Sequence, residues 1–209
     1  MEPLLTHSER EWILIGMAEC CARQGYEATN VADICAAAGV SRRAFQKAFA
    51  DKRECLGAVM EAFVEEAWRR LDGVRSPGKT WEEELGDGVA ALAGLAAERP
   101  AFARVALVEA PAAGGRAGAL HGSCKAALLA SAERGQAQEE ADVPASAARG
   151  ALAGAEALVV TKLLAGEGDR LHELAPEITY LLTVPYLGRD GALRAAGAPK
   201  RKRHLRAVA

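Results

Sequence analysis

Apolar residues recur at helical spacing along most of this 209-residue chain, and no segment alternates apolar and polar residues over more than a few positions. Strand-favouring β-branched residues are sparse, while Ala and Leu supply most of the apolar share. A strand presents every second side chain to one face, whereas a helix presents every third or fourth. The pattern therefore predicts an all-α fold.

Helix-capping residues divide the first third of the chain. Asn30, Ser41 and Asp51 are good N-caps, and Gly25 and Gly39 suit the position that follows a helix C-terminus. The helices predicted between these signals span about 8–24, 30–38, 41–49 and 51–71. The last of them is long and leads out of a group of short helices.

A loop at residues 72–79 contains both Gly and Pro, and helical spacing resumes beyond it. Pro176 could either start the last helix of the chain or kink it. The further helices are predicted at about 80–98, 100–109, 116–137, 144–166 and 171–187.

Two short helices separated by a Gly-containing turn, and preceded by a third, describe a helix-turn-helix whose second helix enters the DNA major groove. The formal net charge of the whole chain is −2, so nucleic-acid binding would need a local basic patch. Between residues 39 and 53 there is a single acid, Asp51, and the basic residues there are Arg42, Arg43, Lys47, Lys52 and Arg53. A merely solvated helix face is the alternative interpretation.

The segment GYEATNVADICAAAGVS at residues 25–41, followed by Phe45, Phe49, Asp51-Lys52 and Leu56, resembles the DNA-binding domain of the tetracycline-repressor (TetR) family. The resemblance covers roughly residues 8–60. It implies a homodimer that binds one DNA half-site per subunit, usually released from its operator by a small molecule. It also implies a helix-turn-helix domain at 1–56, joined by a long helix to a helical ligand-binding and dimerisation domain at 57–190. We expect a basic, disordered tail at 191–209.

The resemblance assigns the base-facing start of the recognition helix to Arg42, Arg43 and Ala44. An exposed Arg can bind guanine O6 and N7 together, and Ala44 can contact a thymine methyl group. Gln46 and Lys47 stand where the family more often has aromatic residues that contact phosphate. Here Lys47 can neutralise a phosphate, and Gln46 can reach an adenine edge.

Thr29, Asn30 and Lys52 match phosphate-clamping positions at the starts of the second and fourth helices, where free N–H groups favour anions. Ser41, at the start of the recognition helix, is included in the predicted DNA contact surface. Asn30 could instead act only as a helix cap.

The helices after residue 57 could enclose a cavity or simply pack tightly, and the sequence does not distinguish the two. Large or polar side chains amid Ala and Leu would shape a pocket. They are Trp68, Trp81, Phe102, His121, Cys124 and Tyr180, and all but Trp81 are taken as ligand-binding candidates. His121 and Cys124 lie three residues apart, but no further ligand joins them, so neither a metal site nor a cofactor is predicted.

Helices 144–166 and 171–187 carry apolar residues on more than one side, and Gly150 and Gly154 would allow a close approach. We expect the pair to form a four-helix interface with a second copy of the chain. The alternative is that these faces are covered within the subunit.

Several classes of protein are disfavoured. Five cysteines form no CxxC pair, which favours buried thiols over a zinc or redox site. No apolar run is long enough for a membrane span, and the N-terminus does not look like a secretory signal, so we expect a cytoplasmic protein. No catalytic motif supports an enzyme. The basic run Lys200–Arg203 could be a solubilising end or could add nonspecific DNA affinity.

The sequence therefore predicts a regulator that is most consistent with a repressor, released from a palindromic operator by a small-molecule effector. The alternative is a DNA-binding regulator with no small-molecule ligand, whose C-terminal domain serves dimerisation or protein docking.

Overall fold

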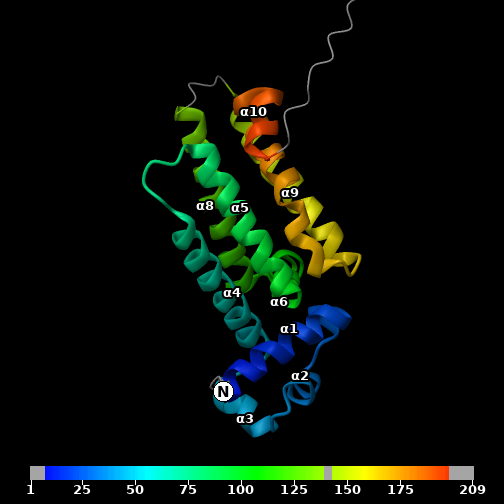
Figure 1. Ribbon diagram of the computed structural model, residues 1–209. Coiled ribbons are helices and arrows are strands. Elements are labelled where there is room, and N and C mark those ends of the chain that lie inside the picture. The colour runs from blue at the N-terminus through cyan, green and yellow to red at the C-terminus, as the bar shows by residue number, and fades with distance from the viewer. Residues whose placement is uncertain (1–7, 139–142, 198–209) are drawn as a thin grey trace, which may run out of the picture.

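The computed structural model describes residues 8–138 and 143–197, and within these ranges it contains helices and no strand (Figure 1). This confirms the predicted all-α fold. None of the helices in the described ranges is long and apolar enough to cross a membrane.

Three helices make up the end of the molecule that contains the N-terminus (Figure 1). Asn30 caps the second with its side chain, which accepts the N–H groups of Ala32 and Asp33, and Ser41 caps the third by accepting the N–H of Ala44. Gly39, in the left-handed conformation, ends the second helix as predicted. The three are α1 (Glu9–Ala28), α2 (Val31–Ala38) and α3 (Arg42–Ala48).

Helix α1 is longer than the sequence predicts. Gly25 interrupts this helix instead of ending it, because the helix resumes for three more residues up to Ala28. The backbone at Gly25 has φ 80° and ψ 162°, a region open almost only to glycine. The kink turns the last residues of α1 toward the start of α2.

Helices α1 and α2 are in close contact at Gly16. A Cβ atom at this position would lie 2.9 Å from the backbone nitrogen of Ala38 and 3.0 Å from the carbonyl oxygen of Ile34. Around this contact, Ile13, Met17, Ile34, Phe45 and Phe49 are buried together. The short helices are therefore held by a core that they build jointly, since two or three turns of helix are marginal alone.

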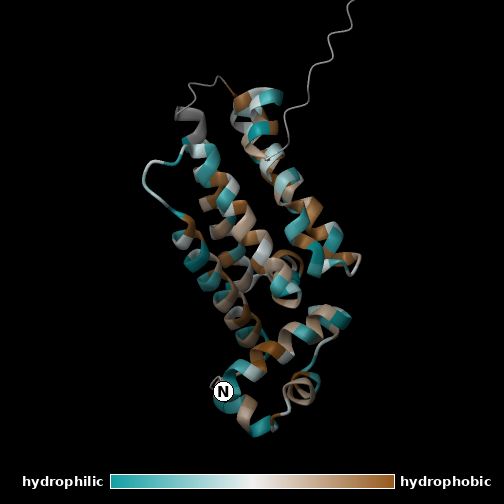
Figure 2. Ribbon diagram, viewed as in Figure 1, coloured by the Kyte–Doolittle hydropathy of each residue, from teal (hydrophilic) through white to brown (hydrophobic). Residues whose placement is uncertain are grey.

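Helix α4 (Lys52–Val74) leads away from these helices and lies beside α5 (Trp81–Glu98) and α8 (Gly115–Gln138) (Figure 1). Hydrophilic and apolar stretches alternate along the long helices, as expected for helices that bury one face (Figure 2). The remaining elements are α6 (Pro100–Arg104), the π-helical turn η1 (Val105–Glu109), α7 (Ala110–Ala113), α9 (Ala145–Leu164), the 3₁₀ turn η2 (Gly168–Leu174) and α10 (Ala175–Ala195).

The last helix differs from its prediction at both ends. Residues 171–174 belong to η2, and Pro176 lies in the first turn of α10, where its missing N–H costs no hydrogen bond. Helix α10 continues past residue 190, the expected end of the second domain, and Ala192 is fully buried. The run Lys200–Arg203 lies outside the described residues.

The hydrophobic core does not stop at the domain boundary predicted at residue 56. One cluster joins α1, α2 and α3 to Leu56, Val59 and Met60 of α4, and it also contains Phe102, Val105 and Ala106. The N-terminal helices are therefore packed directly on the α6–η1 segment, which places that segment between the two ends of the molecule.

Candidate nucleic-acid interface and cavity

Helix α3 presents a polar surface to solvent. Arg42, Arg43, Gln46 and Lys47 are exposed, while Phe45 on the opposite side is 1% exposed and anchors the helix in the core. Phe45 also packs on Phe49, with ring centroids 5.8 Å apart. The anchored side fixes which residues face outward.

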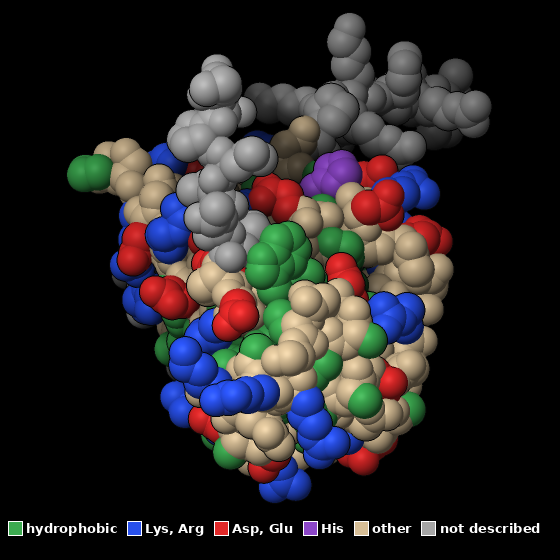
Figure 3. Space-filling view, turned by 90° about the horizontal axis from the view of Figure 1, so that it is seen from below, with side chains coloured by type: hydrophobic (Ala, Val, Ile, Leu, Met, Phe, Trp, Pro, Cys, Tyr) green, Lys and Arg blue, Asp and Glu red, His purple; other side chains and the backbone are tan. Residues whose placement is uncertain are grey.

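The basic side chains of α3 are not neutralised within the chain. Arg42, Arg43 and Lys47 form no ion pair with any residue in the described ranges. Ala44 is half-buried beside them. Figure 3, which views this end of the molecule, shows both Lys and Arg side chains and carboxylates on the exposed surface. Helix α3 therefore offers free cations of the kind that phosphates and guanine edges bind.

The two predicted phosphate-clamping residues at the start of α2 differ in exposure. Thr29 is 1% exposed, and its hydroxyl donates to the carbonyl of Gly25 at 2.7 Å. Asn30 is exposed, and its side chain caps α2. Only Asn30 is open to a phosphate in this structure.

Lys52 is engaged at the C-terminus of α1. Its Nζ donates to three carbonyl oxygens, those of Tyr26 at 3.0 Å, Glu27 at 3.2 Å and Thr29 at 2.9 Å. The ammonium group also lies 4.4 Å from the centroid of the Tyr26 ring. A cation at this position satisfies carbonyls that the end of a helix leaves without partners. All three N–H donors of Lys52 are thus used inside the chain, and its predicted phosphate contact stays a prediction.

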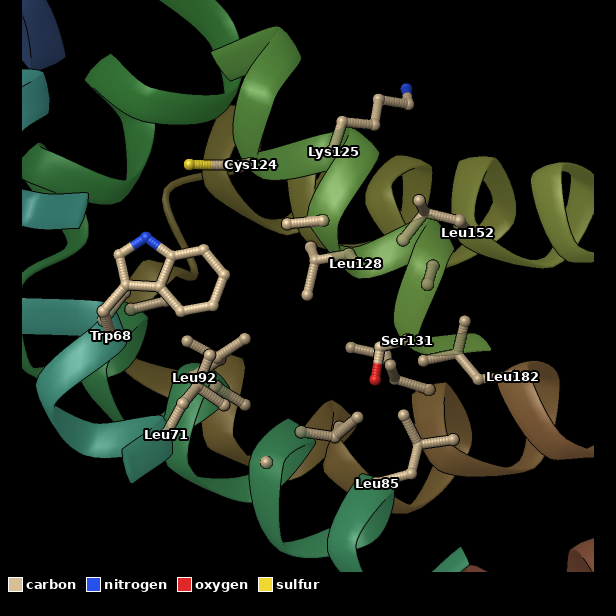
Figure 4. A pocket seen from close by; sticks show the side chains of 18 of the residues that line it. Trp68, Leu71, Leu85, Leu92, Cys124, Lys125, Leu128, Ser131, Leu152 and Leu182 are labelled. Atoms are coloured by element: carbon tan, nitrogen blue, oxygen red, sulfur yellow. The ribbon is translucent and has the colours of Figure 1, made fainter. Parts of the chain in front are cut away.

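A cavity of about 610 Å³ lies inside the C-terminal part of the chain (Figure 4). Leucine and valine side chains and many alanines form most of its wall. Its large apolar lining residues include Phe63 and Leu71 from α4, Leu85, Val89 and Leu92 from α5, Leu128 from α8, Leu152 from α9, and Ile178 and Leu182 from α10.

Three of the five predicted ligand-binding residues line this cavity, namely Trp68, His121 and Cys124. Phe102 does not line it, because its side chain belongs to the core that joins α6 to the N-terminal helices. Tyr180 is half-buried on α10 and is likewise outside the cavity wall. Trp81 does line the cavity, where it packs edge-on against Tyr186 and donates to the carbonyl of Ser131 at 3.3 Å.

The cavity reaches the surface between α4 and α8. Trp68 on α4 and Leu128 on α8 both line it, yet they are 41% and 37% exposed. Large apolar side chains with this exposure are uncommon in the described part of the chain. We take the gap between them as the opening of the cavity.

A polar cluster lies in one part of the cavity wall. The Nδ1 of His121 lies 3.1 Å from the carbonyl oxygen of Ala106, and its Nε2 lies 3.5 Å from Oε1 of Glu156. Lys125 pairs with the same carboxylate at 2.5 Å, and in Figure 4 its side chain points away from the cavity. Both ring nitrogens of His121 therefore face oxygen atoms.

The cysteines Cys20, Cys21, Cys35 and Cys55 are buried, and Cys124 is partly exposed. Burial raises the pKa of the Cys21 thiol to about 12, and it also raises the pKa of Cys124. Thiols with raised pKa values are poor nucleophiles and poor metal ligands. Within the described ranges, no group of three or more His, Cys, Asp and Glu side chains is placed to hold a metal ion.

The fold is a helix-turn-helix unit, α1 to α3, with an attached helical part that encloses a cavity. Residues 13–59 match the family model described as bacterial regulatory proteins, tetR family. The match covers the N-terminal helices and agrees with the resemblance to the TetR family seen at residues 8–60. No curated protein sequence matches the chain significantly.

Solved structures with a similar fold include bacterial regulatory proteins. The fatty acid degradation regulator FadR from Bacillus halodurans has a TM-score of 0.68 and 19% identity, with coverage of 85% of this chain and 95% of that one. FadR from Bacillus subtilis, in complex with stearoyl-CoA, has a TM-score of 0.66 and 19% identity, with coverage of 82% and 96%. A tetR-family regulatory protein from Rhodococcus RHA1 has a TM-score of 0.69 and 19% identity, with coverage of 93% and 100%. At these identities the likeness establishes the fold.

Proposed function

We propose that this protein is a homodimeric repressor of the TetR family that reads a palindromic operator with α3 and leaves it when an elongated apolar effector enters the cavity. The observation that carries the proposal is the combination of unpaired cations on α3 with a large cavity along α4. Helix α4 begins directly after α1, α2 and α3, which we call the DNA-binding helices. The cavity counts against the alternative of a regulator without a small-molecule ligand.

Operator reading is proposed for the exposed side of α3. Arg42 and Arg43 stand in its first turn, where side chains reach base edges in helix-turn-helix proteins. Gln46 and Lys47 follow one turn later on the exposed surface. Asn30, which is exposed at the start of α2, is a proposed phosphate contact.

Dimerisation is proposed for α9 and α10. Gly150, Gly154, Ala157 and Thr161 are exposed along one side of α9, and Leu164 at its end is 57% exposed. Small side chains allow a second helix to approach closely, and an exposed leucine favours burial. A dimer would place the two α3 helices about one turn of DNA apart, roughly 34–36 Å.

The shape of the cavity supports an elongated effector. Its wall follows α4 from Met60 to Val74, which is about 20 Å at the 1.5 Å rise per residue of a helix. Its volume leaves room for about 20 non-hydrogen atoms, at the roughly 30 Å³ that a water molecule occupies in the liquid. A molecule with one long, unbranched apolar chain fits both figures. The stearoyl-CoA bound to Bacillus subtilis FadR has such a chain.

The DNA part of the proposal is tested by selecting duplexes from a random pool with the purified protein, which we expect to return an inverted repeat. Fluorescence anisotropy then measures the affinity for the selected operator. Replacing Arg43 with Ala should cost about 1–3 kcal/mol and relax the preference at one base pair per half-site. Arg170→Ala, which removes an exposed cation far along the chain, is the control. Equal weakening on every sequence would make Arg43 a phosphate contact.

The effector part is tested with saturated acyl-CoAs of graded chain length. Binding should quench tryptophan fluorescence, because both Trp68 and Trp81 line the cavity, and it should lower operator affinity. Ala127→Phe, which fills the cavity from α8, should abolish both effects and leave operator affinity without acyl-CoA unchanged. If no acyl-CoA binds or changes operator affinity, the apolar-chain effector is refuted.

A further inference from the structure

Glu109 is a buried acid that joins the C-terminal part of the chain to the DNA-binding helices. The residue is 8% exposed. Its Oε2 accepts the backbone N–H of Tyr26 at 2.9 Å, and its Oε1 accepts from Nε of Arg104 at 3.3 Å. Acidic side chains are rarely buried without such partners, because removing a carboxylate from water costs free energy.

The hydrogen bond falls at the kink of α1. Tyr26 follows Gly25, whose backbone leaves the helical conformation, so its N–H has no regular helical partner. The carbonyl of the same Tyr26 accepts from Lys52, the first residue of α4. The side chain of Thr29 donates to the carbonyl of Gly25. The end of α1 is thus tied by side chains from three places, of which only Glu109 comes from beyond α4.

Glu109 is also tied to the cavity. It is the last residue of η1, a π-helical turn in which the N–H of Ala110 donates to the carbonyl of Val105. Ala106 and Leu107 of the same turn line the cavity, and the carbonyl of Ala106 faces His121, another lining residue. Single π-helical turns are often found at functional sites. One short turn therefore has residues on the cavity and a carboxylate on the DNA-binding helices.

We propose that Glu109 is a positioning residue that holds α1, and through it α2 and α3, in the orientation that binds the operator, and that the effector acts by shifting η1. The part of this inference that concerns the effector rests on the proposed function. A hydrogen bond weakens steeply with distance and angle, so a small movement of Ala106 and Leu107 is enough to release Tyr26. The release loosens the kink that leads into α2.

The test compares wild-type protein with Glu109→Met, which removes the acceptor at similar volume, and Glu109→Gln, which keeps one acceptor oxygen for two donors. Glu98→Met is the matched control, because Glu98 is an exposed acid whose partner, Arg70, lies on α4. Hydrogen exchange is followed in a peptide that contains Tyr26. Anisotropy on the selected operator gives DNA affinity with and without stearoyl-CoA, and tryptophan fluorescence gives the affinity for stearoyl-CoA.

We expect exchange at Tyr26 to be at least tenfold faster in Glu109→Met and intermediate in Glu109→Gln. Operator affinity should fall about tenfold in the first variant and less in the second. The further loss caused by stearoyl-CoA should shrink, while its own affinity stays within twofold of wild type. Glu98→Met should behave as wild type. If Glu109→Met does not fold, Glu109→Gln gives the same comparison on a smaller scale.

Two results would overturn the proposal. Unchanged exchange at Tyr26 would show that Glu109 does not hold the kink. Faster exchange with unchanged operator affinity would show that it holds the kink without positioning α3. A failure of the proposed function is seen separately, because the wild-type protein would then bind no selected duplex or ignore stearoyl-CoA, whereas exchange at Tyr26 needs neither DNA nor ligand.

Discussion

Replacing Lys52 with Met separates two roles for one residue. The sequence predicts a phosphate contact, whereas the structure has the ammonium group bonded to the carbonyls of Tyr26, Glu27 and Thr29. Methionine keeps an unbranched apolar stem of similar length and removes the charge and the three donors. The substitution therefore leaves packing nearly intact and deletes the cap of α1.

The expected loss of stability follows from these contacts. Hydrogen bonds to charged groups contribute about 1.5–3 kcal/mol each, but three that share one half-buried ammonium are not additive. The contact with the Tyr26 ring adds about 0.5–1 kcal/mol. We expect the free energy of unfolding to fall by about 2–3 kcal/mol. For a chain of this size that lowers Tm by about 5–10 °C in a circular dichroism melt.

DNA binding gives the second readout. Each phosphate contact contributes about 0.9 to the slope of log affinity against log salt, so losing one per subunit would reduce the slope of a dimer by about 1.8. If Lys52 only caps α1, the slope on the selected operator should not change in Lys52→Met. Lys47→Met is the control. Because Lys47 is exposed, this variant should reduce the slope of log affinity against log salt with little change in Tm. Wild-type stability together with a reduced slope in Lys52→Met would refute the capping argument.

Three further predictions concern stability and reactivity. Gly16→Ala should lower the free energy of unfolding, measured with urea, by about 1–2 kcal/mol, because the added Cβ would press on the backbone of α2. Gly122→Ala, at an open site in α8, should raise it by about 0.5–1 kcal/mol. Equal effects of the two substitutions would contradict the close contact at Gly16. Hydrogen bonds from Arg69 and Arg70 lower the pKa of Glu66 to about 2, so its contribution should be complete above pH 4.5 and be lost as the pH falls toward 2. Stability curves of wild type and Glu66→Gln should therefore converge at low pH, and a constant difference would argue against the pairing. A maleimide should label Cys124 first in the native protein and all five cysteines only after unfolding; rapid native labelling of Cys21 would show that its burial is wrong.

The DNA-binding helices could be predicted closely because their limits are set locally. The side chains of Asn30, Ser41 and Asp51 each accept N–H groups from the first turn of the helix that they cap. Gly39 adopts the left-handed conformation, which glycine enters without a steric penalty. Such signals need no knowledge of the rest of the fold. Gly25 was misread as a terminator because a glycine with positive φ also permits a kink, and only the packing beyond it decides between the two.

The cavity and its lining could be predicted only in part. Trp68, His121 and Cys124 were found because they interrupt stretches of Ala and Leu, but the same criterion also selected Phe102 and Tyr180. Whether a large side chain faces a cavity or a packed core depends on which helices surround it, and helical spacing gives only the side of its own helix. Glu109 carried no sequence signal, because its partner is a backbone N–H 83 residues away.

Met60 and Ala106 connect the cavity to helices α1 to α3. Both residues line the cavity, and both belong to the hydrophobic cluster that contains Ile34 and Phe45. Close-packed interiors do not deform gradually, so an effector that displaces these two side chains must be accommodated by a shift of the helices packed on them. The hydrogen bond from the Tyr26 N–H to Glu109 has narrow geometric limits, so such a shift can break it. The apolar cluster is therefore suited to transmit a movement, and the hydrogen bond at the kink is suited to set the displacement at which the orientation of α3 is lost.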